Sequence, residues 1–339
     1  MSERESYREF WRKATVAVAG GGSWGTVLAH LISKQVAEVR ILVRQEDQAR
    51  SINSQRANPH YVPELQLSGR VKAYPSLDRV FEGKVNALVW ALPSDVSRTE
   101  ARRIAGLVQG DEYIFHATKG IEPGTNRRMS EILREELPCP RIGVISGPNL
   151  AGEIARGEPA ATVVASRFDD VIFAGQALFG GEGFRVLGDH DLVGIEWAGA
   201  LKNIYGIAAG AVEAKGLGWN TKAMLYTFAL EEIVRFTVPL GARASTLSGV
   251  AGLGDLVATC SSPLSRNFRV GFRLAQGESL AQVLEEIGQT AEGVRTAQTV
   301  VEYARQRKLS LPIAEAVHGL VTGQVSVDEL LKTVSGANS

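Results

Sequence analysis

The chain has 339 residues, 45% of them apolar, and domains of roughly 150 residues are common, so two domains with sizeable cores are expected. Its 37 Lys and Arg residues balance 37 Asp and Glu residues, which gives a formal net charge of zero. A neutral chain lacks the basic surface that general binders of nucleic acids or acidic membranes use. We therefore expect no nucleic-acid partner, and any charge-based function must be local.

The first half of the chain alternates short apolar runs with helical patterns. Buried strands are expected at 15–19, 38–43, 86–91, 113–117, 142–145 and 161–165. Helices are expected between them at 24–33, 96–107 and 127–136. Strands that alternate with helices predict a parallel sheet covered on both faces, so residues 14–190 are expected to form a doubly wound α/β domain.

From about residue 190 the strand signal disappears and helical spacing takes over. Helices are expected at 193–214, 221–236, 280–285 and 294–307, which predicts an all-α domain over residues 191–339. The longest apolar stretch, 193–212, is interrupted by Glu196, Lys202 and Asn203, so it predicts a buried helix and no integral membrane segment. Residues 1–13 form an N-terminal extension, for which a flexible segment or a docking helix is expected.

The two cysteines, Cys139 and Cys260, are too few to staple a chain of this length, and their scarcity fits a reducing compartment. The first residues, MSERES, carry acids and no apolar core of a secretory signal, so a cytoplasmic location is expected. The five histidines show no i, i+4 or Cys-rich spacing, so no metal site is expected.

Residues 16–26, VAVAGGGSWGT, combine a strand, a tight turn and the start of a helix. Gly20, Gly22 and Gly25 fit the pattern G-x-G-x-x-G, in which one glycine permits the turn, one admits a pyrophosphate against the backbone, and one lets the helix meet the strand. The helix N-terminus adds free N–H groups and a partial positive charge. Because a second strand follows, this context favours dinucleotide binding over a glycine turn without a ligand.

The second expected strand runs into Arg44, where NAD-selective sites place an acidic residue for the ribose 2′-hydroxyl. Glu46 and Asp47 follow two and three residues later. An arginine can accept a 2′-phosphate, so NADP should be at least tolerated and the cofactor is expected to be NAD or NADP. The alternative stays open that Arg44 is a solvated loop residue and that the two acids begin the next helix.

Further motifs follow at characteristic spacing. They are ATKGI at 117–121, SGP at 146–148, GALKN at 199–203, NTKA at 220–223, GLGDL at 252–256, LSRN at 264–267 and AEG at 291–293. Together with the glycine loop, they make the chain resemble the NAD(P)-dependent glycerol-3-phosphate dehydrogenases from residue 20 to about residue 296. The resemblance implies a Rossmann-like first domain. It also implies interconversion of dihydroxyacetone phosphate and sn-glycerol 3-phosphate with NAD(P)H, which supplies phospholipid synthesis.

Three residues would carry the chemistry in a protein of this kind. Lys202 lies among small residues, where lost hydration lowers the pKa of a lysine, and the alternative is a lysine that reaches the surface. The resemblance implies that Lys202 exchanges a proton with the C2 oxygen and that Lys119, otherwise a solvated turn lysine, polarises the carbonyl. It places Asp255 beside the catalytic lysine, although such an aspartate often caps a helix. Asn203 would orient these groups or pack the helix.

The phosphate of the substrate would lie at a helix start. Ser262 is placed as its N-cap and Pro263 at the first helical position, so that Arg266 completes a local anion site. The resemblance implies phosphate contacts by Arg266 and Asn267, with Ser265 beside them. An ordinary capped helix with an exposed arginine is the alternative.

The remaining contacts rest on the resemblance. It implies substrate contacts at Gly147 and Asn149, and Asn149 is also a plausible N-cap, although many relatives carry Ser or Thr there. It implies cofactor contacts at Gly20, Gly22, Ser23, Trp24, Gly25, Arg44, Pro93, Lys119, Ala151, Arg266, Thr290 and Glu292. With catalytic groups on both domains, partial domain closure is expected.

Two other kinds of protein share parts of this pattern. A two-domain hydroxyacid or ketopantoate-type reductase would share the glycine loop and a catalytic lysine, but would not need a phosphate site at Arg266. A non-catalytic NAD(P)-binding module would leave Lys202 and Asp255 unexplained. The sequence leaves the oligomeric state open, with a homodimer as one option.

Overall fold

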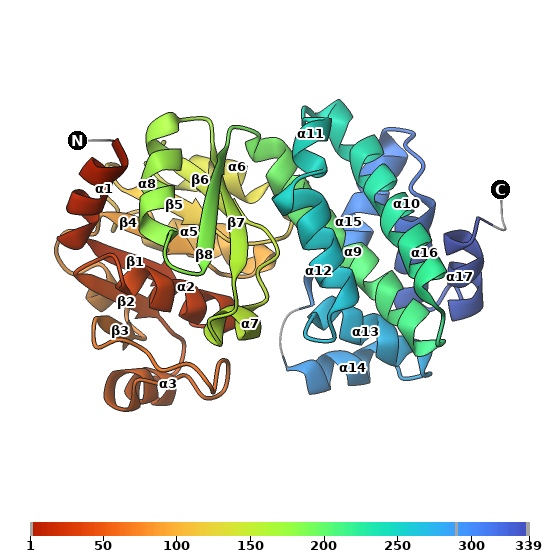
Figure 1. Ribbon diagram of the computed structural model, residues 1–339, viewed down its shortest axis with the longest axis horizontal. Helices are drawn as coiled ribbons and strands as arrows, with labels where there is room; N and C mark the ends of the chain where they lie inside the picture. Colours follow the sequence, from red (N-terminus) through yellow and green to blue (C-terminus); the bar gives the residue numbers. More distant parts are fainter. Residues whose placement is uncertain (1–2, 289–290, 337–339) are drawn as a thin grey trace. The chain divides into compact units, whose positions relative to one another are not determined.

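The computed structural model describes residues 3–288 and 291–336. The chain forms two compact units (Figure 1). The first contains Met1–Thr118 and Met129–Leu192, and the second contains Lys119–Arg128 and Val193–Ser339. The short segment Lys119–Arg128 thus belongs to the second unit. The sequence analysis had divided the chain into two continuous stretches, 14–190 and 191–339, and so had placed this segment in the first domain.

The first unit is built on an eight-stranded sheet of order β3-β2-β1-β4-β5-β6-β7-β8. Its strands are β1 (Thr15–Ala19), β2 (Glu38–Leu42), β3 (Val71–Tyr74), β4 (Ala87–Trp90), β5 (Tyr113–His116), β6 (Ile142–Ser146), β7 (Ala160–Ser166) and β8 (Phe184–Asp189). All six expected strands are present. The sequence missed β3 and β8, because β3 alternates buried and less buried residues and β8 buries only Phe184, so both lack a continuous apolar run.

The sequence predicted a parallel sheet, and this prediction is wrong at one place. Strands β6 and β7 pair antiparallel. The connection between them contains only α7 (Ala151–Ala155), which packs against α2 (Ser23–Ser33). A parallel return needs a crossover that carries the chain back along the strand, and a five-residue helix rises only about 7.5 Å. The chain therefore re-enters the sheet from the end at which β6 left it.

Helices cover both faces of this sheet. Successive residues of β1 point to opposite faces, so Val16 and Val18 join one apolar core and Ala17 and Ala19 join the other. The first core lies under α2 and α8 (Asp169–Phe179), and the second lies under α4 (Leu77–Val80), α5 (Ser97–Ile104) and α6 (Met129–Glu136). The doubly wound arrangement predicted from the sequence is therefore confirmed.

The N-terminal extension forms α1 (Glu3–Arg12), which packs on α8. Trp11 is fully buried, and its indole N–H donates a hydrogen bond of 3.0 Å to the carbonyl of Ala174. The extension is thus a packed helix of the first unit.

The second unit surrounds one long helix, α9 (Leu192–Ala214), which is buried along almost its whole length. Around it lie α10 (Trp219–Thr237), α11 (Ala244–Leu247), α12 (Asp255–Ser261), α13 (Arg266–Ala275), α14 (Leu280–Ile287), α15 (Glu292–Gln306), α16 (Pro312–Val321) and α17 (Val327–Val334). Glycines let α9 and α13 touch: a Cβ on Gly210 would lie 1.9 Å from the carbonyl oxygen of Phe268. Among the helices of the described residues, none combines the length and apolar character that a bilayer crossing requires.

Candidate functional site

The glycine loop, residues 20–25, lies at the carboxyl end of β1, between β1 and α2. Gly20 has a φ of +115°, and Gly25 packs so closely that a Cβ there would lie 1.9 Å from the carbonyl oxygen of Gly20. Gly22 differs, because its φ is −74° and an added Cβ would meet no atom within 4 Å. The loop itself therefore requires glycine at positions 20 and 25, whereas Gly22 faces open space at the start of α2.

The residues around this loop fit a dinucleotide. Ser23 and Trp24 form the first turn of α2, which carries no acidic residue to compete with a phosphate. The indole N–H of Trp24 is buried without a hydrogen-bond acceptor among the described residues. Such a donor can be satisfied by a bound ligand. The glycine loop, an open helix N-terminus and an unsatisfied donor together fit a pyrophosphate and its ribose.

Other expected cofactor residues lie near the carboxyl ends of the strands. Arg44 follows β2 and is exposed, and Glu46 and Asp47 begin α3 (Glu46–Arg50). These positions agree with the alternative that Arg44 is a solvated loop residue and that the two acids begin a helix. Pro93 follows β4 and caps the short helix Ser94–Val96. Ala151 begins α7. These placements agree with the edge at which doubly wound sheets bind ligands.

Two lysines share one buried carboxylate in the second unit. Lys119 Nζ lies 2.6 Å from Asp255 Oδ2, and Lys202 Nζ lies 2.6 Å from Asp255 Oδ1. Asp255 is 2% exposed and begins α12, and Lys202 lies within α9. The alternatives of a surface lysine at 202 and of a helix-capping Asp255 are wrong, because Lys202 is buried and no side-chain cap bond forms at α12.

Thr259, which the sequence analysis missed, completes this lysine–aspartate cluster. Its hydroxyl oxygen accepts a hydrogen bond from Lys202 Nζ. Asp255 and Thr259 are four residues apart on α12, so they share one helix face. That spacing is the signal that could have found Thr259.

The cluster carries an excess of positive charge, because two ammonium groups face a single carboxylate. Burial lowers the pKa of Lys119 to about 8, the attraction of Asp255 opposes this shift, and the charge of Lys202 adds to it. A cationic lysine with a pKa this near neutrality can polarise an oxygen and can also lose its proton.

A chain of amides anchors the segment that carries Lys119. Asn203 donates from Nδ2 to the backbone carbonyl of Lys119 at 3.1 Å and accepts from Asn267 Nδ2 at 2.9 Å. Asn267 Oδ1 in turn accepts from the backbone N–H of Gly293 at 3.0 Å. Asn203 therefore orients its neighbours and packs the helices at once. Both ends of the Asn267 side-chain amide thus make hydrogen bonds within the protein.

The helix start at the expected phosphate site lies one turn later than predicted. Ser262 ends α12 and opens a turn, and Ser265 is the N-cap of α13, accepting from the N–H of Phe268 at 3.4 Å. The assignment of Ser262 as N-cap and of Pro263 as first helical residue is wrong, because residues 262–265 close a turn through a hydrogen bond from Ser265 N to Ser262 O.

Arg266 begins α13 with an exposed side chain. The charge of Glu292 at the start of α15 acts on it, so these two expected residues lie near each other. Thr290, an expected cofactor contact, lies outside the described residues.

Gly147 and Asn149 lie in the first unit after β6. Asn149 is not an N-cap as predicted. Leu150 occupies that position of α7, because the Asn149 side chain turns to β7 and accepts from Thr162 Oγ1 at 2.9 Å. Lys119, Lys202 and Asp255, the residues expected to be catalytic, all lie in the second unit, whereas the sequence analysis had expected them on both domains.

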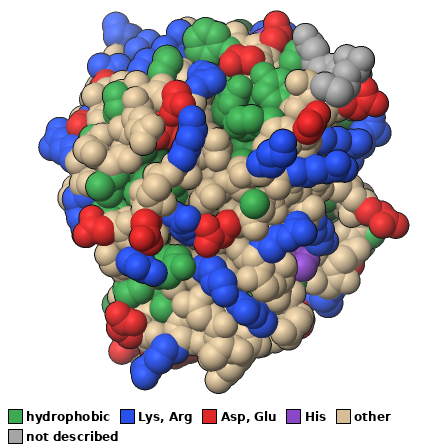
Figure 2. All heavy atoms as spheres, turned by 90° about the vertical axis from the view of Figure 1, so that its left-hand side faces the viewer, with side chains coloured by type: hydrophobic (Ala, Val, Ile, Leu, Met, Phe, Trp, Pro, Cys, Tyr) green, Lys and Arg blue, Asp and Glu red, His purple; other side chains and the backbone are tan. Residues whose placement is uncertain are grey.

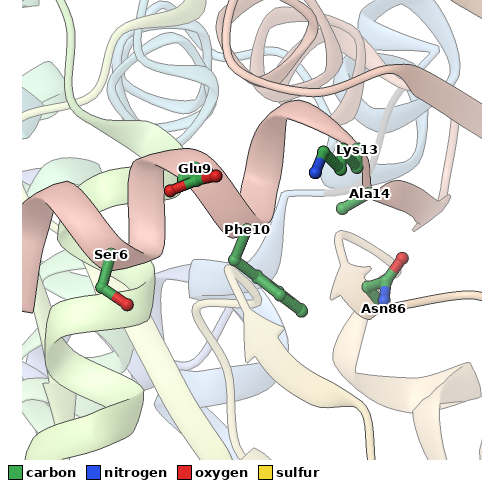
Figure 3. A pocket seen from close by; sticks show the side chains of 6 residues that line it. All are labelled: Ser6, Glu9, Phe10, Lys13, Ala14 and Asn86. Carbon is green, nitrogen blue, oxygen red and sulfur yellow. The ribbon is translucent and has the colours of Figure 1, made fainter.

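Two surface features lie outside this site. Figure 2 shows basic and acidic side chains interspersed over one face of the molecule. A shallow hollow, drawn in Figure 3, is lined by Ser6, Glu9, Phe10, Lys13, Ala14 and Asn86. It lies where β1 and β4 begin, at the edge opposite to that used for ligands in such sheets. We therefore assign the hollow no part in the reaction.

A glycine loop on a doubly wound sheet, with paired lysines on a buried carboxylate in a helical unit, defines a nicotinamide-dependent oxidoreductase. Family models point to one group within this class. The N-terminal model of the NAD-dependent glycerol-3-phosphate dehydrogenases matches residues 15–171, and the C-terminal model matches residues 191–332. The chain belongs to this family.

Individual relatives agree. A glycerol-3-phosphate dehydrogenase [NAD(P)+] of Pseudomonas paraeruginosa is 43% identical over 306 residues, which cover 90% of this chain and 89% of the relative. The crystal structure of glycerol-3-phosphate dehydrogenase from Coxiella burnetii matches with a TM-score of 0.89 and 32% identity, covering 96% of this chain and 99% of that one. A ketopantoate reductase from Ralstonia eutropha shares the fold alone, with a TM-score of 0.58 and 15% identity over 93% of this chain and 99% of that one.

Proposed function

We propose that this enzyme interconverts dihydroxyacetone phosphate and sn-glycerol 3-phosphate with NAD(H) or NADP(H). The observation that carries the proposal is the lysine–aspartate cluster, in which Lys119 and Lys202 each lie 2.6 Å from Asp255. The names of the relatives support the same reaction. When bound, the reduced nicotinamide supplies a hydride to C2 of the ketone.

Lys202 is the proton donor of this proposal. Its Nζ gives a proton to the C2 oxygen as the electron pair of the carbonyl double bond moves onto that oxygen, which leaves an alcohol and a neutral amine. Asp255 and Thr259 hold Nζ in place throughout. Lys119 stays cationic and stabilises the charge that develops on the oxygen, an effect that is often the largest in catalysis.

Substrate phosphate recognition is assigned to the start of α13. Ser265 is the N-cap of α13 and Asn267 lies in its first turn, both of them buried, and Arg266 extends an exposed guanidinium beside them. A helix N-terminus and an arginine favour a dianion. Binding energy from the phosphate would then orient the reacting carbon. Gly147 and Asn149 remain predicted substrate contacts.

The glycine loop is assigned the cofactor pyrophosphate, with Ser23, Trp24, Pro93, Lys119, Ala151, Arg266 and Glu292 as further expected contacts. Arg44 stands where an NAD-selective site has an acid, so NADPH should be at least tolerated beside NADH. Measured dissociation constants for the two cofactors, compared between the native chain and Arg44→Asp, test this point. A preference for NADPH that survives the substitution would contradict it.

The decisive experiment follows nicotinamide absorbance with dihydroxyacetone phosphate as substrate. Lys202→Ala is expected to lose nearly all activity. Lys215→Ala, which alters a partly exposed lysine paired with Asp328, is expected to keep it. Dihydroxyacetone without its phosphate should react far more slowly, whereas equal rates would favour a reductase of the ketopantoate type. Full activity in Lys202→Ala would remove the proposed proton donor.

Two further statements belong to this proposal. The product would supply glycerol 3-phosphate for phospholipid synthesis, and the enzyme would act in the cytoplasm. The oligomeric state can be measured directly. Light scattering coupled to size-exclusion chromatography measures the molar mass, and a mass near 36.4 kDa would identify a monomer.

A further inference from the structure

Asn58, which lies outside every motif named above, forms a hydrogen bond to the backbone of the glycine loop. Asn58 is 1% exposed and lies in the connection between α3 and β3. Its Nδ2 donates to the carbonyl oxygen of Gly21 at 3.0 Å and to Thr26 Oγ1 at 2.8 Å. Gln48 Nε2, from α3, donates to the same Gly21 oxygen at 2.7 Å. Two side-chain amides therefore converge on one carbonyl.

These bonds decide which way the next N–H points. In a trans peptide the C=O of one residue and the N–H of the next point in opposite directions, and no cis peptide occurs among the described residues. Because the Gly21 oxygen faces Asn58 and Gln48, the N–H of Gly22 must face the other side. The space beside the Cα of Gly22 is open, since an added Cβ there would meet no atom within 4 Å.

The loop needs such a restraint because Gly20, Gly21 and Gly22 follow one another. Three glycines in a row have far more backbone freedom than other residues, and that freedom must be lost when a ligand is bound. A site that is already ordered before binding avoids this cost. The two amides supply the order without occupying the space in front of the loop.

We propose that Asn58, assisted by Gln48, is a positioning residue of the cofactor site: it fixes the Gly21–Gly22 peptide so that the Gly22 N–H is presented to the pyrophosphate. The inference rests on the proposed binding of the cofactor by the glycine loop. Asn58 itself contacts the loop and not the cofactor. Its replacement should therefore weaken cofactor binding and leave the later steps intact.

The test compares NADH dissociation constants, measured by titration calorimetry without substrate. Asn58→Leu, similar in size and uncharged, is expected to raise the dissociation constant about tenfold or more, because a buried orienting hydrogen bond is lost. Gln48→Met should have a smaller effect in the same direction, because Gln48 is only half-buried, whereas Asn58 is 1% exposed and also bonds Thr26 Oγ1 at the start of α2. The KM for NADH should rise, while kcat at saturating NADH should change less than about threefold, as expected for lost binding alone.

Asn53→Leu is the matched control. Asn53 lies in the same connection and makes two comparable bonds, from Nδ2 to Ala73 O at 2.8 Å and from Ala73 N to Oδ1 at 2.9 Å, without touching the glycine loop. It should lower stability about as much as Asn58→Leu and leave the NADH dissociation constant unchanged. Equal affinity losses in the two variants would mean that Asn58 acts only through general stability, which overturns the inference.

A fourth variant separates this inference from the proposed function. Gly22→Ala adds a methyl group to the open side of the loop, so it should weaken NADH binding strongly if the cofactor lies there. Unchanged binding in Gly22→Ala would overturn the proposed cofactor site. Weakened binding in Gly22→Ala together with unchanged binding in Asn58→Leu and Gln48→Met would overturn the positioning role alone.

Discussion

The glycine loop of the first unit and the lysine–aspartate cluster of the second each prepare a place for a polar ligand group, but by different physical means. The loop uses backbone N–H groups, missing side chains and neutral amides, with Asn58 and Gln48 as its supports. The cluster uses full charges, two ammonium groups on one carboxylate that is 2% exposed. Shape therefore governs the first region and charge governs the second.

This difference predicts different responses to change. A neutral loop should be insensitive to pH and sensitive to the addition of a single methyl group. A buried charge cluster should respond strongly to any change in charge, because burying an unpaired charge is costly. Substitutions in the two units can therefore show whether the division holds.

Asp255→Asn is expected to have the largest effect. The neutral amide leaves Lys119 and Lys202 facing each other without the negative charge that holds both of them. We expect kcat/KM to fall by about 10²- to 10⁴-fold, the range for loss of a general acid–base group, in steady-state assays. Asp328→Asn is the control. It alters a 75% exposed carboxylate paired with Lys215 and should leave kcat/KM unchanged. A fall smaller than tenfold would show that the cluster is not the centre of the chemistry.

Arg128→Met tests whether buried charge also holds the segment that carries Lys119. Arg128 forms an ion pair with Glu196 of α9, and the two side chains are only 9% and 3% exposed. Leaving Glu196 buried without this partner should cost about 3–5 kcal/mol in the free energy of unfolding, measured with urea. The double variant Arg128→Met/Glu196→Leu should recover most of the loss.

Arg156→Met removes an ion pair that is about half exposed on both sides, so it should cost less than about 1 kcal/mol. Similar losses for Arg128→Met and Arg156→Met would contradict a role for burial. The NADH dissociation constant should stay unchanged in Arg156→Met, because this ion pair does not touch the glycine loop.

The same contrast explains what the sequence could predict. The glycine loop is contiguous, so its strand, turn and helix can be seen in residues 16–26. The cluster draws Lys119, Lys202 and Asp255 from distant positions, and only the resemblance to a family brought them together. No pattern in the sequence placed Lys119 in the second unit, because that depends on its bonds to Asp255 and Asn203.

Other residues gave a weaker signal. Asn58 is a single polar residue in a connection, and only the fold shows that it contacts Gly21. The edge strand β3 carries Lys72 and Tyr74 on its less buried positions, and β8 buries only Phe184, which hides both strands from a search for apolar runs. Ser262 and Ser265 both suit an N-cap, and the turn closed by the hydrogen bond from Ser265 N to Ser262 O decided between them.

A pH profile sharpens the comparison through Lys119. Burial lowers the pKa of Lys119 to about 8, so its cationic form is lost as the pH rises through that value. We expect kcat/KM for ketone reduction to be level below pH 8 and to fall about tenfold per pH unit above it, as free-enzyme titration requires. Lys119→Arg, which stays protonated, should move the falling limb upward. The NADH dissociation constant of the native enzyme should change much less than kcat/KM from pH 7 to 9, and a parallel change in both quantities would contradict the division between shape and charge.

The smallest effect concerns stability without cofactor at the glycine loop. Gly22 has φ −74° and ψ −175°, which alanine adopts readily, and an added Cβ meets no atom within 4 Å. Alanine loses less backbone entropy on folding, which stabilises by about 0.4–1 kcal/mol, but it is a poorer N-cap than glycine. Because these effects oppose each other, Gly22→Ala should change the free energy of unfolding by less than about 1 kcal/mol. Gly25→Ala should destabilise far more, since its Cβ would lie 1.9 Å from the Gly20 oxygen. Thermal unfolding of both variants without NADH measures this, and equal losses would mean that Gly22 serves the fold of the loop and not the ligand.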